Sequence, residues 1–415
     1  MLDALADRTR PIVIRADRLL TPEGVVEAAL RVEDGRIVEI GAPPEADALR
    51  LDARGLLVAP ALVDVHGDAF ERQMAPRPGV HFPLDVAAID TDRQLAANGV
   101  ATAYHALTLS WEPGLRSVGQ GEAFLDALEA LGPRLGVEHR LQLRWETFAT
   151  EALAFIARAL AGPLTPSLAF NDHTSMTMRP AHVAVQDRAP DCDPDRPAAD
   201  AADPAIAARI EGPAKRSGLS PEAYRALLAT VWARRADVGA VCAQVARDAA
   251  AAGAPMLSHD DNTPTLRAHY RALGARIAEF PMNVETARAA RAAGDFIVFG
   301  APNVVRGGSH LGGSPGAADM VEDGLCDILA SDYFYPAMLN AAARLVRERR
   351  LPLARAWDLV SGGPARASGL ADRGALAVGS RADIVAVDWP DRGAPAVRAT
   401  LSGGRIAHLG GVPVA

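Results

Sequence analysis

The sequence is short of lysine: Lys215 is the only one, and every other strongly basic side chain is an arginine. Chemistry that needs a lysine in the core of the protein is therefore nearly excluded. Cysteine is also scarce, because only Cys192, Cys242 and Cys326 occur and they lie far apart. Their spacing indicates neither a disulfide framework nor a zinc knuckle.

Long apolar runs and a basic excess are both missing. No run reaches the roughly 18 apolar residues that a membrane helix needs, and residues 1–20 carry too many charges for a signal peptide. The formal net charge is −8, whereas a protein that binds nucleic acid typically has a basic surface. We therefore expect a soluble, cytoplasmic protein with no nucleic-acid or membrane partner, and whether it forms a homo-oligomer stays open.

Short strand patterns are present at both ends of the chain. Residues 11–57 contain apolar runs separated by turns, and the Asp34–Gly35 pair between two such runs predicts a β-hairpin. The runs that follow residue 374 have the same character. Because 415 residues exceed one ordinary hydrophobic core, we expect residues 1–60 and 372–415 to form together a small β-sandwich domain.

The middle of the chain, residues 61–371, alternates short apolar runs with helical patterns, for example at residues 121–132 and 283–294. This alternation predicts an α/β fold, a (β/α)8 TIM-like barrel, with a doubly wound open sheet as the alternative. A segment rich in Pro, Asp and Ala at about residues 174–222 is either a lid-like insert or a disordered one. The candidate strands are residues 61–66, 101–107, 140–147, 166–171, 255–259, 276–280, 296–300 and 327–331.

Six histidine and acidic side chains fall at the carboxyl ends of predicted strands, which meet on one face of a barrel. Singly, each has an ordinary explanation as a hydrogen-bonded residue or a helix N-cap, and this holds for Asp260 and Asp261 too. Jointly they predict a metal site for zinc, with Mn, Fe or Ni as alternatives. A bridging carboxylate would let the site hold two ions, which lower the pKa of a shared water. The six residues are His66, Asp68, Glu146, His173, His259 and Asp332.

The β-rich segments at both ends, followed by the sequence LLVAPALVDVHGD, resemble the amidohydrolase superfamily. Its common pattern has H-x-H on the first strand, a bridging carbamylated lysine, two later histidines and an aspartate on the last strand. Here His66–Gly67–Asp68 stands in place of H-x-H, and Glu146 stands where the bridge would be. Lys215 lies in the long insert, so a carbamate bridge is implausible. The resemblance implies a barrel of the metal-dependent hydrolase type.

A more specific resemblance runs in order through most of residues 60–345. The stretches HGDAFERQMAPRPGVHFP, LRWE, FNDHT, AKRSGLS, LSHDDNT, AEFPMNVETARAARAAG, GAPNVVRGGSHLGG and ILASDYFYPAMLNAA resemble the diphosphatases of the carbon–phosphorus lyase pathway. Members of that subfamily release pyrophosphate from α-D-ribose 1-methylphosphonate 5-triphosphate. Local departures are Ala69, Phe70 and an enlarged insert at about residues 185–205. The resemblance implies a small phosphorylated sugar as substrate.

Cationic side chains near these motifs are candidates for phosphate binding. The glycine-rich residues 300–313 follow a predicted strand, and glycines let backbone N–H groups approach an anion closely. Each candidate has an alternative role as an exposed or ion-paired surface residue. An acidic protein must nevertheless gather cations locally to bind a triphosphate. The candidates are Arg72, Arg77, Lys215, Arg216, Arg306 and His310.

The mechanism we expect from this resemblance is attack of a metal-bound hydroxide on phosphorus. One ion is held by His66, Asp68 and Asp332, a second by His173 and His259, and Glu146 bridges them. Asp332 accepts the proton of the attacking water as a general base. The alternatives are an amidohydrolase that cleaves a C–N bond in a cyclic amide, amino sugar or N-acyl amino acid, and a barrel that has lost its catalytic site.

Overall fold

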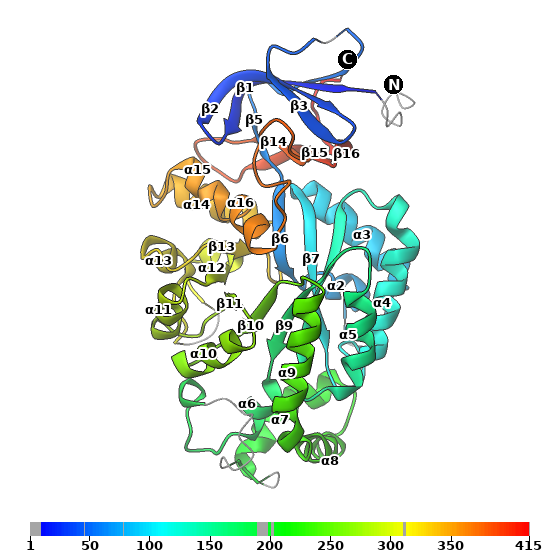
Figure 1. Ribbon diagram of the computed structural model, residues 1–415, viewed down its shortest axis with the longest axis vertical. Coiled ribbons are helices and arrows are strands. Elements are labelled where there is room, and N and C mark those ends of the chain that lie inside the picture. Colours follow the sequence, from blue (N-terminus) through cyan, green and yellow to red (C-terminus); the bar gives the residue numbers. More distant parts are fainter. Residues whose placement is uncertain are drawn as a thin grey trace.

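The structure is a computed structural model that describes residues 10–44, 46–77, 79–188, 198–200, 203–309 and 313–414. The two end segments of the chain build a β-domain at one end of the molecule, and a barrel ringed by helices lies next to it (Figure 1). The helices are α2 (Glu71–Met74), α3 (Leu84–Ala97), α4 (Val118–Leu131), α5 (Leu153–Leu160), α6 (His173–Met178), α7 (Pro204–Arg216), α8 (Pro221–Trp232), α9 (Arg235–Ala251), α10 (Pro264–Ala272), α11 (Val284–Ala292), α12 (Ala301–Arg306), α13 (Ala317–Glu322), α14 (Ala337–Arg347), α15 (Leu353–Asp358) and α16 (Gly362–Ala367), with 3-10 turns η1 (Gly132–Arg134), η2 (Thr150–Ala152) and η3 (Val185–Asp187).

Both ends of the chain contribute to one mixed sheet, as predicted. Its hydrogen-bonded order is β16-β15-β14-β5-β1-β2-β3, and β4 pairs with β1. The predicted hairpin is present, because Asp34 and Gly35 have φ values of 48° and 76°, the left-handed pair that a tight hairpin turn requires. The strands are β1 (Ile12–Thr21), β2 (Gly24–Glu33), β3 (Arg36–Gly41), β4 (Leu49–Asp52), β5 (Leu57–Pro60), β14 (Ile384–Asp388), β15 (Ala396–Ser402) and β16 (Arg405–Leu409).

The eight strands predicted for the barrel are confirmed, each within a few residues. They pair in parallel in the order β13-β12-β11-β10-β9-β8-β7-β6, so neighbours in the chain are neighbours in the sheet. The doubly wound alternative, in which strand order reverses, is wrong. The strands are β6 (Leu62–Gly67), β7 (Val100–Leu109), β8 (Glu138–Glu146), β9 (Ser167–Asn171), β10 (Met256–His259), β11 (Ile277–Glu279), β12 (Phe296–Gly300) and β13 (Ile328–Ala330).

Contacts between β6 and β13 join the two ends of the barrel sheet. An isolated parallel bridge links Gly67 to Asp332, in which the backbone N–H of Asp332 donates to the carbonyl of His66 at 2.9 Å and the N–H of Asp68 donates to the carbonyl of Asp332 at 2.9 Å. The buried carboxylate of Asp64 accepts from the backbone N–H and the hydroxyl of Ser331 at 3.0 and 2.5 Å. The first and last strands are thereby fixed side by side.

Alternation of side chains along β8 shows how the barrel separates its two faces. Leu141, Leu143 and Trp145 pack into the core under the outer helices. On the opposite face, Gln142 reaches Glu279 across the barrel interior, and Glu146 lies beside His173, which follows the neighbouring strand β9. The period of two residues follows from the pleat of a β-strand. Polar side chains at every second position therefore reach the interior near its carboxyl end.

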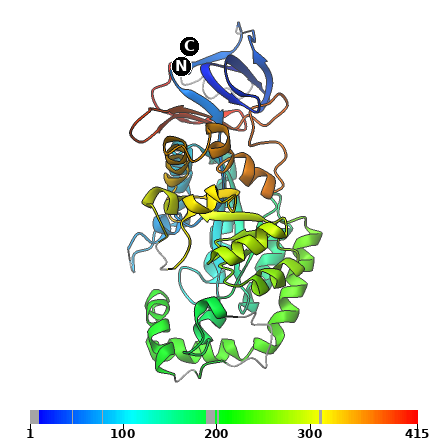
Figure 2. The same cartoon turned by 90° about the vertical axis from the view of Figure 1, so that its left-hand side faces the viewer.

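Helices α6 and α7, from the long insert, and α8, which follows it, lie beyond the carboxyl ends of the barrel strands (Figures 1 and 2). These helices share a small apolar core, which includes Met178, Ile210 and Leu228. Trp111, in the loop after β7, donates from Nε1 to Thr174 Oγ1 at 2.9 Å, which ties the insert to the barrel. Across the described ranges, none of the helices combines the length and apolar character that a bilayer crossing requires.

A buried chain of three titratable side chains joins α3, β7 and β8. Because the carboxylate of Asp92 can only accept, His139 donates to it from Nε2 at 3.0 Å. The Nδ1 of His139 then accepts from Nε2–H of His105 at 2.8 Å. Burial, with the adjacent His139, lowers the pKa of His105 well below its ordinary value. The rings of Phe70 and Phe124 also contact His105.

This depressed pKa predicts a pH-dependent stability. Below about pH 6.5 the unfolded chain protonates His105 whereas the folded chain does not, so the unfolded state binds more protons. We expect the free energy of unfolding to fall by about 1.4 kcal/mol per pH unit from this residue below about pH 6.5. In the His105→Gln variant the amide still donates toward His139 but does not titrate. Its free energy of unfolding, measured with urea between about pH 5 and pH 7, should therefore change less with pH. An equal dependence in both proteins would contradict the assignment.

Candidate active site

The barrel brings three of the predicted metal residues together at the junction of its first and last strands. His66 lies in β6, Asp68 follows β6, and Asp332 follows β13 after two residues. Ligand atoms of these three side chains all lie within 4.8 Å of one another. The backbone contacts between Gly67 and Asp332 close the barrel. They hold His66 and Asp332 side by side, although 266 positions separate these two residues in the sequence.

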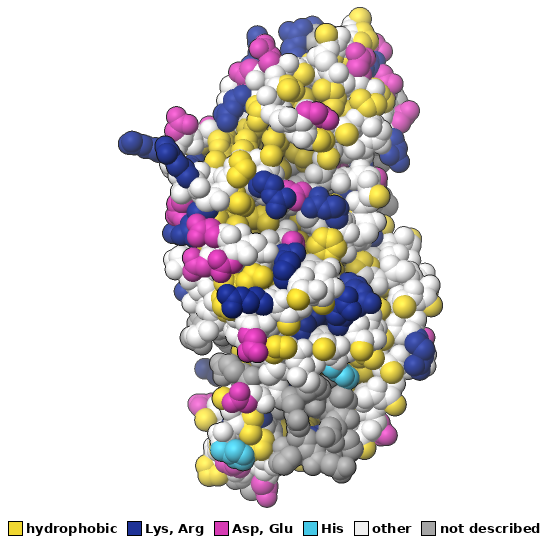
Figure 3. Space-filling model, turned by 60° about the vertical axis from the view of Figure 1, so that its left-hand side comes forward, with side chains coloured by type: hydrophobic (Ala, Val, Ile, Leu, Met, Phe, Trp, Pro, Cys, Tyr) yellow, Lys and Arg dark blue, Asp and Glu magenta, His cyan; other side chains and the backbone are white. Residues whose placement is uncertain are grey.

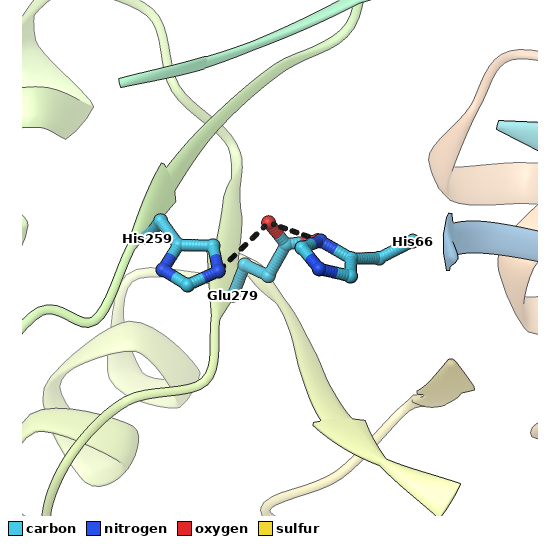
Figure 4. A group of neighbouring side chains, drawn as sticks. All are labelled: His66, His259 and Glu279. Carbon is cyan, nitrogen blue, oxygen red and sulfur yellow. Dashed lines mark ion pairs between the residues drawn. The ribbon is translucent and has the colours of Figure 1, made fainter. Parts of the chain in front are cut away.

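Glu279, at the end of β11, is a site residue that the sequence reasoning missed. Its carboxylate lies between the imidazoles of His66 and His259 (Figure 4). The Oε2 atom is 3.1 Å from His66 Nδ1 and 3.9 Å from His259 Nε2, and Gln142 donates to Oε1 at 2.9 Å. The signal was available, because Glu279 ends a predicted strand as the other six residues do.

Opposing effects set the charge state of this buried group. Burial alone would raise the pKa of Glu279, but the adjacent His66 and His259, with the Gln142 hydrogen bond, lower it. Burial alone would lower the pKa of His66, but Glu279 raises it. The geometry therefore favours an ionised Glu279 carboxylate, which orients the His66 ring through its Nδ1 atom.

Glu146, at the end of β8, and His173, at the start of α6 after β9, form a separate pair. Glu146 accepts from the backbone N–H of His173 at 3.0 Å and lies 2.6 Å from its Nδ1, and Asn171 donates to it at 3.0 Å. Burial alone would raise the pKa of Glu146, but His173, with a further contribution from Arg144, lowers it to about 2. The His173 side chain is 47% exposed, so it faces the cavity that lies beyond the strand ends.

The residues after β10 divide between the cavity and the scaffold. Asp260 Oδ2 lies 2.9 Å from His259 Nδ1. Asp261 is fully buried and instead pairs with the buried Arg267 at 3.2 Å. Neither caps the following helix, because the N-cap of α10 is Thr263, whose side chain accepts from the N–H of Leu266.

Three non-glycine residues at the site have left-handed backbone conformations. The φ values are 57° at Asp260, 54° at Phe280 and 55° at Asp332, immediately after β10 and β11 and close behind β13. Such conformations carry strain unless the surrounding structure enforces them, and they concentrate at functional sites. They turn the chain sharply at the strand ends, so that the adjacent polar side chains remain at the cavity.

The two larger cavities that the described residues form at the carboxyl end of the barrel share two lining residues. The first, about 270 Å³, is lined by His66, Asp68, His259 and Asp332 together with Phe280, Phe299, Asn303 and Tyr333. The second, about 400 Å³, is lined by Glu146 and His173 and by Arg179, Arg209, Arg216, Trp111 and Tyr224 of the insert and the loop after β7. Arg116 and Arg144 line both cavities. The six predicted metal residues are therefore divided between two cavities that share Arg116 and Arg144.

The predicted substrate-binding residues occupy different environments. Arg216 lines the second cavity, whereas Arg72, Arg77 and Lys215 are exposed and are not among the residues that line either cavity. Arg306 is exposed and donates to the hydroxyl of Tyr333 at 3.4 Å. On one face of the molecule, basic side chains gather across the middle (Figure 3). His310 lies outside the described residues.

Gly67 is required by the close approach of β6 to β13. A Cβ atom at this position would lie 2.7 Å from Asp64 Oδ2 and 2.9 Å from Ser331 Oγ. We expect Gly67→Ala to destabilise the protein by about 1–3 kcal/mol and to lower activity by displacing Asp332. Thermal unfolding checks the first effect. Gly119→Ala on α4 is the control, because its Cβ meets no atom within 4 Å; equal stability of the two variants would contradict the prediction.

The donor set fits a divalent cation. Both ring nitrogens of His259, the Nδ1 of His66 and the Oε2 of Glu279 are buried and make no hydrogen bond of good geometry. Buried polar groups ordinarily have partners, and imidazole with carboxylate is the donor combination of zinc and similar metals. Within the described residues, the two candidate groups are His66–Asp68–Asp332 and His66–His259–Glu279.

Comparisons with known proteins agree with this architecture. Residues 213–408 match a family model described as "Amidohydrolase family". Over 385 residues the chain is 31% identical to alpha-D-ribose 1-methylphosphonate 5-triphosphate diphosphatase of Escherichia coli (strain K12), with 90% of this chain and 94% of that protein covered.

Solved structures of low sequence identity share the fold. Dihydropyrimidinase from Brevibacillus agri NCHU1002 is 14% identical, with a TM-score of 0.59 and coverage of 95% of this chain and 94% of that one. Molinate hydrolase is 14% identical, with a TM-score of 0.62 and coverage of 96% and 94%. The match to the amidohydrolase family model and the 31% identity over nine-tenths of the chain show that the chain belongs to the amidohydrolase superfamily.

Proposed function

We propose that this protein is a metal-dependent hydrolase that releases pyrophosphate from α-D-ribose 1-methylphosphonate 5-triphosphate. The observation that carries the proposal is an arginine-lined cavity directly beside a cluster of imidazoles and carboxylates. Cleavage of a neutral C–N bond has no use for a concentration of guanidinium groups, whereas a triphosphate does. The 31% identical relative, which is named for this reaction, supports the same choice.

We assign the six strand-end residues to two divalent cations, with zinc as the first choice. His66, Asp68 and Asp332 would hold one, and His173 and His259 the other, with Glu146 between them. Glu279 would orient His66 and His259. Bound cations would supply Lewis acidity, which acidifies water and offsets the charge that builds on phosphoryl oxygens.

The remaining chemistry belongs to the chain's own side chains. Water attacks a phosphorus atom, the phosphoric anhydride bond breaks, and the bridging oxygen remains with one of the two phosphate products. The carboxylate of Asp332, held beside His66 and Asp68, accepts the proton of the attacking water. Arg144, which lines both cavities, stabilises charge on the phosphoryl oxygens, whereas Arg116, which also lines both, is paired with Glu71 at 2.9 Å.

The test is a phosphate analysis of metal-loaded protein incubated with the ribose phosphonate triphosphate, with ATP and a cyclic amide in parallel. We expect release of pyrophosphate from the first compound and its loss in His173→Ala. Protein that holds metal but releases no pyrophosphate from either triphosphate would overturn the proposal. Opening of the cyclic amide in that case would establish C–N hydrolysis instead.

A further inference from the structure

The second cavity contains more cationic charge than its own carboxylates can neutralise. Five arginines line it, Arg116, Arg144, Arg179, Arg209 and Arg216, against the two carboxylates Glu112 and Glu146. Arg116 is paired with Glu71, which lies outside the lining, at 2.9 Å, so four arginines face the two carboxylates. Both carboxylates are engaged by side chains of the cavity. Glu112 accepts from the Tyr224 hydroxyl at 2.5 Å and lies 3.6 Å from Arg216, and Glu146 is bonded to His173.

Arg144 is the most buried of these cations. Only 8% of the residue is exposed, and its Nε is buried without a hydrogen-bond partner. No ion pair joins it to any residue in the part of the chain that the structure describes. A buried charge ordinarily has a partner of opposite sign, and Arg144 lies where the first and second cavities meet.

Arg179 and Arg209 are held in place without being neutralised. Arg209 donates to the carbonyls of Thr177 and Arg179 at 2.9 and 2.6 Å, and Arg179 donates to the carbonyls of Met176 and Val183 at 2.7 and 3.2 Å. Burial lowers the pKa of Arg179, and the charges of Arg209 and Arg188 lower it further. No carboxylate among the described residues pairs with Arg179 or Arg209, so their charges remain available to an anion.

The first cavity has a different character. It contains Phe280, Phe299 and Tyr333 with the polar side chain of Asn303, and its arginines are the two that it shares with the second. Aromatic and amide groups suit a sugar ring, which presents apolar faces and hydroxyls. Bidentate guanidinium groups suit phosphate oxygens.

We propose that the second cavity is the subsite for the terminal diphosphate of the substrate, and that the sugar portion occupies the first. This inference rests on the proposed function. Arg144 contacts the phosphate group at the junction, and Arg179, Arg209 and Arg216 hold the two phosphate groups beyond it. The insert thus determines which leaving group the barrel accepts. A diphosphate fills the second cavity, whereas a single phosphate leaves part of the positive charge of the cavity's arginines uncompensated.

The experiment measures pyrophosphate and inorganic phosphate binding to metal-loaded protein by calorimetry. We expect pyrophosphate to bind at least about 10-fold more tightly than phosphate, because additional charge-assisted hydrogen bonds form. Arg216→Glu and Arg209→Ala should each weaken pyrophosphate binding by about 10-fold or more. Arg247→Glu, an exposed residue of α9, makes the same charge change away from both cavities and should leave binding unchanged.

The outcomes separate this inference from the proposed function. Arg209 links α6 to α7, so the thermal unfolding of the Arg209→Ala variant is measured as well. If that variant is unfolded, Arg216→Glu, which changes an exposed residue, still tests the inference. If the protein hydrolyses the triphosphate but Arg216→Glu and Arg209→Ala bind pyrophosphate as tightly as the original protein does, the subsite is wrong and the proposed function is retained. Arginine-dependent pyrophosphate binding without any anhydride cleavage would overturn the function and leave an anion site.

Discussion

Replacing Asp332 with Asn is expected to lower the rate of the proposed anhydride hydrolysis by about 10²–10⁴-fold, the usual contribution of a general base. The amide retains the shape of the side chain but cannot accept the proton of the attacking water. The backbone at this position has φ of 55°, which asparagine tolerates as well as aspartate does. The measurement is steady-state turnover, with bound metal quantified in the same preparation.

The control for this substitution is Asp34→Asn. Asp34 has a similar left-handed φ of 48°, but it lies in the hairpin turn between β2 and β3, so we expect turnover to be unchanged. Near-normal turnover of Asp332→Asn with metal bound would refute the role of Asp332 as base. Loss of turnover in proportion to lost metal would instead assign Asp332 to metal binding alone.

Replacing Glu279 with Gln is expected to weaken metal binding by about 10–100-fold, the usual effect of removing a partner that orients a ligating histidine. The carboxylate lies 3.1 Å from His66 Nδ1 and is held by Gln142, so it fixes the ring and increases the basicity of the opposite nitrogen. Competition against a chelator measures the affinity. Turnover should recover when metal is added in excess, because the groups that touch the substrate are unchanged.

A substitution on the following helix provides the comparison for Glu279. Glu285 is exposed on α11, and Glu285→Gln removes the same charge close by in sequence without touching either histidine. We expect it to retain the metal affinity of the original protein. Equal affinities in Glu279→Gln and in the original protein would show that Glu279 does not position His66.

Much of the fold could be predicted from the sequence because its signals are local. The alternation of apolar runs and helical patterns predicted all eight barrel strands, and the Asp34–Gly35 pair predicted a hairpin whose φ values are the required ones. Six polar residues at predicted strand ends could be recognised in the same way, since parallel strands in a barrel end on one face.

Other features depend on which strands become neighbours. Nothing near Asp64 in the sequence indicates that its carboxylate accepts from Ser331, 267 positions away. Glu279 was missed because a glutamate before Phe-Pro is ordinary at the end of a strand, and its role appears only when β11 places it between β6 and β10. The sequence places Arg144 on the same face of β8 as Gln142 and Glu146, because the three positions are two residues apart. That Arg144 has no ion-pair partner among the described residues depends on how the interior of the barrel is folded.

The sequence by itself determined the barrel, the domain built from both chain ends and the face on which polar strand-end residues gather. These follow from periodicity and strand direction, which a chain carries locally. Only the tertiary structure placed Glu279 between His66 and His259, paired Glu146 with His173, and separated an aromatic-lined cavity from an arginine-rich one. These depend on barrel closure and on how the insert packs over the strand ends, and burial and charge at such positions arise from residues distant in the chain.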